Sequence, residues 1–113
     1  MIDEQKLLHN LKKRNRNSLD DIIKIYTPYV SVIVYNTVGC KLSKEDMEEI
    51  VSDTFFLLWQ SSLNIDETKG NMRSYLATIA RNTSKNKLRK YHSNEVLNEQ
   101  IISSDLTPQD NII

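Results

Sequence analysis

The stretch that decides the fold of this chain is SKEDMEEIVSDTFFLLW, residues 43–59. Ser43 is a typical N-cap residue, and Asp46 follows three residues later in the arrangement of a capping box, where Asp replaces the usual Glu or Gln. Acidic residues fill the first turn, where the helix dipole favours negative charge. The stretch therefore predicts one amphipathic helix.

This helix has two unlike faces. Its apolar side chains recur at helical spacing and should face the core: Met47, Ile50, Val51, Thr54, Phe55 and Leu58. The opposite face carries Glu45, Glu49, Ser52, Asp53, Phe56 and Gln60. An aromatic side chain within an acidic face has two interpretations. Phe56 is either ordinary surface, exposed or covered by a neighbouring helix, or the anchor of a docking face for a basic protein partner.

The composition is that of an ordinary globular domain. The 113 residues, 39% apolar and 27% charged, are enough for one domain with one core. Only two Gly and two Pro occur, which favours an all-α fold over short strands joined by tight turns. One Cys excludes an internal disulfide, and His9 and His92 lie in no ligand motif, so no metal and no cofactor are expected. No apolar run is long enough to span a bilayer, so the expected location is the cytoplasm.

A formal net charge of zero hides a segregation of charge. The acids gather in residues 43–59, whereas residues 69–90 contain seven Lys and Arg residues and no acid. Two oppositely charged elements in one small domain suggest two different partners. The alternative is that the two elements neutralise each other within the fold.

Two more helices are expected before residue 43. Residues 4–14 predict a short first helix, whose basic C-terminal end is favoured by the dipole. Ser18 is the expected N-cap of a second helix.

Pro28 should kink or break that second helix and push Thr27 toward an extended conformation. Residues 29–38 have the propensity of a strand. A lone strand would have no partner, however, and the apolar residues fit a helical stripe. We therefore predict a helix that ends at Gly39.

A polar loop, residues 61–71, precedes the last predicted helix, residues 72–92. Long polar loops in compact domains are more often functional than accidental. The exposed face of the last helix should carry Ser74, Thr78, Arg81, Lys85 and Arg89. Arg81, Lys85 and Arg89, spaced i, i+4 and i+8, form a basic ridge that can follow phosphates, with Asn82 and Asn86 nearby to hydrogen-bond bases. A merely solvated basic face is the alternative.

The last 21 residues, 93–113, have the composition of a linker. Within them, residues 107–110, TPQD, carry the signals of a helix start, but the three residues that follow are too few for a stable helix. The expected organisation is a helical domain over residues 1–92, then a linker and the start of a C-terminal domain over residues 93–113. The chain is thus predicted to be the N-terminal portion of a longer protein.

Three segments together resemble region 2 of bacterial sigma factors of the extracytoplasmic-function type, in the sigma-70 family. They are LDDIIKIYTPYV (19–30), EDMEEIVSDTFFLLW (45–59) and KGNMRSYLATIARNTSKNKLRK (69–90). The resemblance implies a compact all-α bundle of about four helices that acts by binding and not by catalysis. Such a domain binds core RNA polymerase and recognises and helps melt the promoter −10 element, on its non-template strand. The second, helix-turn-helix domain of these factors is not found in the sequence.

The resemblance also implies site residues. The contact with the clamp helices of the largest polymerase subunit falls on the acidic helix, at Asp46, Glu49, Ser52, Asp53 and Phe56. The −10 readers fall in the loop and on the basic helix. Asn64, Ile65 and Asp66 match the loop segment that cradles a flipped base, and Asn82 and Asn86 match base-contacting positions. The remaining candidates for DNA binding are Lys69, Ser74, Thr78, Arg81, Lys85 and Arg89. An anti-sigma factor is a further candidate partner.

This sequence departs from the primary sigma factors at two positions and from a common family residue at a third. Primary sigma factors carry two aromatic residues in the melting helix where this chain has Thr78 and Ile79, as is usual for the extracytoplasmic type, and Tyr75 stands where the family often has Trp. These departures predict a narrow promoter set. Two other functions stay open: a free-standing sigma-fold interaction or regulatory module that does not direct transcription, and a general basic helical DNA-binding protein.

Overall fold

The computed structural model describes the backbone of residues 3–102 and the side chains of residues 3–92. Its elements follow the order α1 (Glu4–Lys12), α2 (Arg16–Val38), η1 (Gly39–Lys41), α3 (Lys44–Gln60), η2 (Ser62–Asn64) and α4 (Met72–Ile102), where η is a short 3-10 helix. All regular structure in the described residues is helical, which confirms the predicted all-α fold. No helix among these residues is long and apolar enough to cross a membrane.

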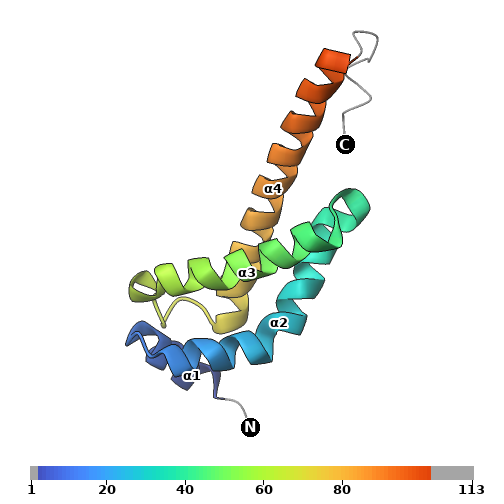
Figure 1. Cartoon of the computed structure of the whole chain (residues 1–113). Helices are drawn as coiled ribbons and strands as arrows, with labels where there is room; N and C mark the ends of the chain where they lie inside the picture. The colour runs from blue at the N-terminus through green and yellow to red at the C-terminus, as the bar shows by residue number, and fades with distance from the viewer. Residues whose placement is uncertain (1–2, 103–113) are drawn as a thin grey trace.

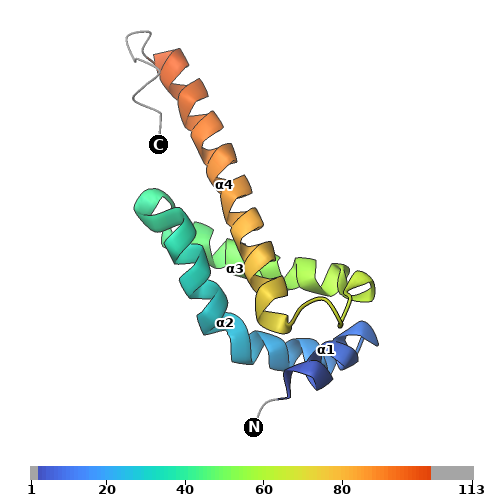
Figure 2. The ribbon, with the colours of Figure 1, turned by 180° about the vertical axis from the view of Figure 1, so that it is seen from behind.

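Helices α2, α3 and α4 contact one another, and α1 packs mainly on α2 (Figure 1). Both views show α4 starting inside the bundle and then running out of it, beyond the ends of the other helices (Figures 1 and 2). Buried side chains from α1 to α4 form one core: Leu8, Leu11, Ile22, Tyr26, Val30, Val34, Val38, Leu42, Ile50, Phe55, Leu58, Ile65, Met72, Leu76 and Ala80.

Helix α3 has the predicted start and the predicted faces. The Ser43 hydroxyl oxygen accepts a hydrogen bond from the Asp46 backbone N–H at 3.1 Å, which satisfies one of the free N–H groups of the first turn. Four members of the apolar stripe are buried, namely Ile50, Thr54, Phe55 and Leu58, and Met47 and Val51 are partly buried against the core. The acidic face points away from the core.

The start of α2 corrects the sequence prediction. The N-cap is Asn15, whose side chain accepts from the Asn17 N–H at 3.0 Å, and not Ser18. Ser18 is already helical and buried, and its hydroxyl donates to the Leu7 carbonyl of α1 at 2.8 Å. Ser18 has the chemistry of a cap, but its hydroxyl is used in a contact between two helices.

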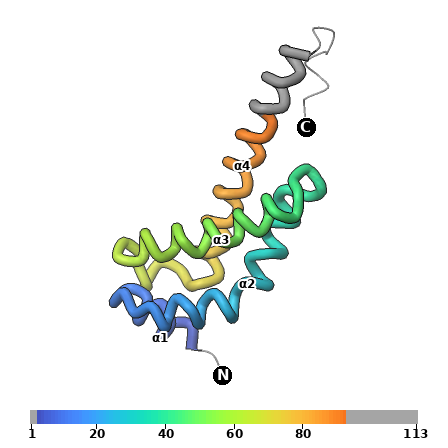
Figure 3. The backbone as a smooth tube through the Cα atoms, in the orientation of Figure 1, coloured from blue at the N-terminus to red at the C-terminus, as the bar shows by residue number. Residues whose placement is uncertain are grey.

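Helix α2 also continues through Pro28, so the predicted break and the extended Thr27 are wrong. The two halves of α2 run in different directions, as expected for a kink at a proline (Figures 1 and 3). A proline inside a helix costs about 3 kcal/mol, whereas each fully buried large apolar side chain contributes about 1.5–3 kcal/mol. Tyr26 and Val30, on either side of Pro28, are both buried, and their burial offsets the cost.

The other end of α2 is as predicted. Residues 29–38 are helical despite their strand propensity, and Gly39 ends the helix with φ 61° and an N–H that donates to the Tyr35 carbonyl. Only glycine adopts such a conformation freely.

Helix α4 is longer than predicted, since it continues past residue 92 to Ile102. No Gly or Pro occurs between Met72 and Ile102, so nothing in the backbone chemistry stops the helix at residue 92. The TPQD start signal at residues 107–110 lies outside the described residues.

Candidate protein and nucleic-acid interfaces

The acidic face of α3 is open to solvent. Glu49, Ser52, Asp53 and Phe56 are exposed, and Asp46 is half-buried. The Phe56 side chain is 57% exposed, so no neighbouring helix covers it within the described chain. Cover by a neighbouring helix is therefore excluded, and two interpretations of Phe56 stay open: ordinary exposed surface, or the anchor of a docking face.

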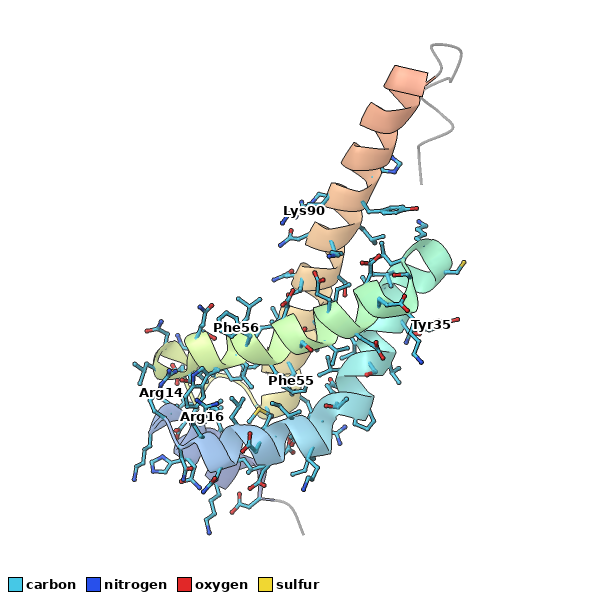
Figure 4. The ribbon with its side chains drawn as sticks, viewed as in Figure 1. Arg14, Arg16, Tyr35, Phe55, Phe56 and Lys90 are labelled. Atoms are coloured by element: carbon cyan, nitrogen blue, oxygen red, sulfur yellow. The ribbon has the colours of Figure 1, made fainter. Side chains whose placement is uncertain are left out.

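Phe56 also lines a groove between α2 and α3, with a volume of about 910 Å³. Arg16 lies at one end of this groove and Tyr35 toward the other, both from α2, while Phe55 and Phe56 come from α3 (Figure 4). None of the site residues predicted from the sequence lies on α2. Tyr35 is 59% exposed although it is large and apolar, yet only the packing of α2 against α3 reveals that Tyr35 and Phe56 share one surface.

One ion pair joins the acidic face to α4. Lys87 Nζ lies 2.6 Å from Glu49 Oε1 and 4.0 Å from Asp46 Oδ1. The hydrogen bond to Glu49 raises the pKa of the Lys87 ammonium group above its usual value, and the Asp46 and Asp53 charges add to this. Neutralisation of the acidic element by the basic one is therefore real but local, because it uses Lys87 and not the basic ridge.

A second cavity, of about 430 Å³, lies between the loop and the start of α4, and we call it the loop pocket. Five of the predicted DNA-binding residues line it: Asn64, Ile65, Lys69, Ser74 and Thr78. Ser61, Gly70, Tyr75 and Ile79 complete the lining. Residues that are separate in the sequence thus form one concave surface.

The loop that forms this pocket is held by its own hydrogen bonds. The Asp66 carboxylate accepts from the Thr68 N–H at 2.9 Å and from the Thr68 hydroxyl at 2.6 Å. These bonds lower the pKa of Asp66 below its usual value. Asp66 itself is exposed but does not line the pocket.

Two predicted DNA-binding residues have structural roles in addition. The Ile65 side chain is only 6% exposed and belongs to the core, so it forms the floor of the pocket instead of a free contact. Ser74 is part of the cap of α4: its N–H donates to Asn71 Oδ1 at 2.9 Å, and its hydroxyl oxygen accepts from the Asn71 N–H at 3.0 Å.

The basic ridge continues from the loop pocket along α4. Arg81, Lys85 and Arg89 are exposed, as are Asn82 and Asn86. The Arg89 guanidinium donates to Asn86 Oδ1. None of the three ridge side chains forms an ion pair with another described residue, so their charges remain open to an anionic partner.

Arg14 positions η2, the first part of the loop, and its role was missed from the sequence. Its guanidinium lies 3.8 Å from the centre of the Trp59 ring, in cation–π geometry. The same group donates to the Trp59 carbonyl at 2.5 Å and to the Ser62 hydroxyl at 3.1 Å. Arg14 adopts a left-handed φ of 64°, a conformation that is uncommon outside glycine.

Together these features define a small all-α domain with an exposed acidic face and an apolar groove at α2 and α3, and with a pocket and a basic ridge at the loop and α4. Residues 22–93 match the family model for Sigma-70 region 2. The match covers more than half of the chain, and the chain belongs to this family of non-enzymatic transcription-initiation domains.

A solved structure has the same fold. It is the NMR structure of the complex formed by an engineered region 2 of sigmaE with GTAAAA. The two structures superpose with a TM-score of 0.69 over 79% of this chain and 88% of that chain, at 20% sequence identity. The four-helix bundle predicted from the resemblance is thereby confirmed. A search of curated proteins found no match.

Proposed function

We propose that this domain holds core RNA polymerase with the acidic face and the groove between α2 and α3, and that it captures an unpaired base of the promoter −10 element in the loop pocket. The observation that carries this proposal is the loop pocket itself. It brings together five residues predicted to bind DNA, of which Asn64 and Ile65 follow from the resemblance, and it opens next to a basic ridge that forms no ion pair within the described residues. The engineered sigmaE region 2 with the same fold is in complex with GTAAAA.

A flipped base suits the chemistry of this pocket. Enzymes and binding proteins that take a base out of the stack read its edge with hydrogen bonds in a shaped cavity. Asn64 offers an amide and Thr78 a hydroxyl, whereas Ile65 and Ile79 offer an apolar floor. Lys69, at the same pocket, can neutralise the phosphate of the captured nucleotide.

The basic ridge supports binding of the strand beyond that nucleotide. Ser74, Thr78, Arg81, Lys85 and Arg89 follow one another on the exposed side of α4 at intervals of three or four residues, so the ridge starts where the pocket ends. A phosphate backbone can follow such a row, with Asn82 and Asn86 beside it as hydrogen-bonding groups for bases.

In this proposal the domain helps to open the −10 element by holding an unpaired base, and not by inserting aromatic side chains between stacked bases. Aromatic side chains that unstack a duplex are replaced here by Thr78 and Ile79. A base that has opened spontaneously is held in the pocket, which shifts the equilibrium toward the open strand. Only sequences whose base fits the pocket gain from this, in agreement with the expected narrow promoter set.

The polymerase contact is supported by chemistry and shape. The exposed carboxylates of Glu49 and Asp53 lie on the same face of α3 as Phe56. Tyr35 and Ile23 extend the apolar surface along the groove. A basic helical partner, such as the clamp helices of the largest subunit, complements both features.

Binding and transcription measured in parallel test the proposal. Fluorescence anisotropy compares single-stranded GTAAAA with a duplex of the same sequence, and we expect the single strand to bind more tightly. Co-purification with core polymerase separates this function from that of a general DNA-binding protein, which would not bind polymerase. Transcription from a promoter selected with the polymerase–domain complex separates it from a regulatory module, which would bind polymerase without starting RNA synthesis.

A matched pair of variants makes the DNA test specific. Asn64→Ala should weaken binding of the single strand, because Asn64 lines the pocket. Asn36→Ala, at an exposed position of α2 outside the pocket, should leave it unchanged. Equal affinity of both variants for GTAAAA and its single-base variants would contradict a role for the loop pocket.

A further inference from the structure

We propose that Tyr75 is a positioning residue, whose hydroxyl fixes the loop in the shape that discriminates between bases. This inference rests on the proposed function of the loop pocket and adds to it a residue that was not among the predicted DNA contacts. It also assigns Tyr75 a role different from unstacking a duplex.

The geometry around Tyr75 places it between the loop and α4. Tyr75 lies in the first turn of α4, its ring lines the loop pocket, and its hydroxyl donates to the backbone carbonyl of Asp66. Asp66 directly follows Asn64 and Ile65, two of the loop residues that line the pocket. The hydroxyl therefore ties the backbone next to the pocket to the rigid helix.

Gly70 lets the ring reach this position. A Cβ atom on Gly70 would lie 3.3 Å from the Tyr75 ring and 3.0 Å from Ser74 Oγ, both closer than ordinary van der Waals contact. A side chain at residue 70 would thus push against the ring and against the cap of α4. The absence of one allows the loop backbone to pass close to Tyr75.

Few other bonds link this part of the loop to the rest of the domain. The Thr68 bonds to the Asp66 carboxylate are local to the loop. Glu67 pairs with His9 of α1 at 3.4 Å, but both side chains are exposed, and such pairs contribute little. Within residues 66–70, the Tyr75 hydroxyl makes the side-chain hydrogen bond that holds the loop backbone to α4. The bonds between Asn71 and Ser74 hold only the last residue of the loop.

A fixed loop matters for discrimination. A pocket that is already ordered does not have to be ordered on binding, and a base that misfits cannot reshape it. A loop released from Tyr75 would adapt to several bases, so the affinity for the best base would fall more than the affinity for the others.

The test compares Tyr75→Phe with Tyr29→Phe. The Tyr29 hydroxyl also donates to a backbone carbonyl near the start of α4, that of Arg73, at 3.2 Å, but Tyr29 lines no part of the loop pocket. Each variant loses one hydroxyl and keeps its ring, so a general loss of stability would affect both alike. The probes are GTAAAA and a panel with every single-base change of it, and amide hydrogen exchange reports on residues 66–70.

We expect the amides of residues 66–70 to exchange faster in Tyr75→Phe but not in Tyr29→Phe. We also expect the ratio of affinities between the best and the median member of the panel to fall about threefold to tenfold in Tyr75→Phe, the range expected for one lost hydrogen bond. Unchanged exchange in Tyr75→Phe would overturn the anchoring role, and faster exchange with unchanged preference would overturn its role in discrimination. If the wild-type chain bound no member of the panel, the proposed function would fail, whereas the exchange experiment would still show whether Tyr75 anchors the loop.

Discussion

Phe56 is the side chain on which the proposed docking face depends. Its ring is 57% exposed, so removing it should cost little folding stability. Because buried aromatic anchors carry a large share of interface energy, Phe56→Ala should weaken binding to core polymerase by at least about 2 kcal/mol, or roughly thirtyfold. Binding is measured by titration of labelled domain with core polymerase.

Val32→Ala is the matched control for this change. Val32 is 58% exposed on α2 but does not line the groove, and its removal should leave the affinity unchanged. Glu49→Lys and Asp53→Lys should also weaken binding, because each replaces attraction to a basic partner by repulsion. If Phe56→Ala bound polymerase as well as Val32→Ala does, the docking face would have been wrongly assigned.

Arg14 shows a different kind of residue, one that shapes a site without lining it. Arg14→Ala loses the Trp59 ring contact and the bonds to the Trp59 carbonyl and Ser62 hydroxyl. We expect a loss of about 1–3 kcal/mol in the free energy of unfolding, measured by urea titration. Arg14→Lys should recover little of it, since one ammonium group cannot stack and donate in the same fork geometry.

The left-handed φ of 64° at Arg14 gives a second variant for comparison. Arg14→Gly removes the same side chain but relieves the backbone strain, and it should therefore be more stable than Arg14→Ala. The reverse order would contradict backbone strain at this position.

At the scale of elements, the basic ridge on α4 allows a quantitative prediction of how DNA binding depends on salt. Each of Arg81→Ala, Lys85→Ala and Arg89→Ala should weaken binding of single-stranded DNA across sequences. Each should also reduce the slope of log K against log salt by about 0.7, the value for one phosphate of a single strand. Anisotropy titrations at several salt concentrations measure the slopes.

Lys24→Ala controls for the loss of a positive charge as such, since Lys24 is exposed on α2 and away from the ridge. Asn82→Ala should instead leave the slope unchanged and relax the preference at one base. A triple ridge variant with the slope of the wild type would refute the phosphate contacts.

The elements also show where sequence reasoning succeeds and where it fails. The start of α3 is predictable because Ser43 and the Asp46 N–H that it caps are three residues apart. The N-cap of α2 was misplaced because the Ser18 hydroxyl bonds to Leu7 in another helix. Pro28 was given too much weight because the burial of its neighbours is a property of the assembled core. A local sequence pattern predicts bonds between neighbouring residues. The errors at Ser18 and Pro28 arise because the deciding contacts are with another helix or with the core.

The candidate site divides in the same way. Exposed positions on α3 and α4 follow from helical periodicity, so the acidic face and the basic ridge were found in the sequence. The groove wall supplied by Tyr35 and the link from Tyr75 to Asp66 depend on how elements pack. Ile65 is predicted from the resemblance as part of the loop segment that cradles a base, but a single apolar residue in a polar loop gives no sign of whether it points inward. Its burial in the core is visible only in the structure.

At the scale of the whole molecule, Lys87 of α4 forms an ion pair with Glu49 of α3 in the free domain. A basic group of polymerase that pairs with Glu49 must displace Lys87. Lys87→Met should therefore tighten polymerase binding, by up to about fivefold, since exposed pairs contribute at most about 1 kcal/mol. A double-mutant cycle of Lys87→Met with Glu49→Gln measures this, and additive effects of the two changes would contradict the competition.

The ion pair should persist throughout the neutral pH range, because the pKa of Lys87 is raised above its usual value. The stability that the pair contributes is lost only as the pH rises through that pKa.

If the acidic face binds polymerase and the basic ridge binds DNA as proposed, the same ion pair should couple the two binding events. When a basic group of polymerase pairs with Glu49, the Lys87 ammonium group on α4 is released. Because Lys87 is close in sequence to Lys85 and Arg89, its charge would then add to the attraction for a nucleic acid. By linkage, whatever factor polymerase adds to the affinity for the strand, the strand must add to the affinity for polymerase. The Lys87–Glu49 ion pair, at 2.6 Å, would then weaken DNA binding by the free domain. It would favour the complex with both polymerase and DNA over either complex with one partner.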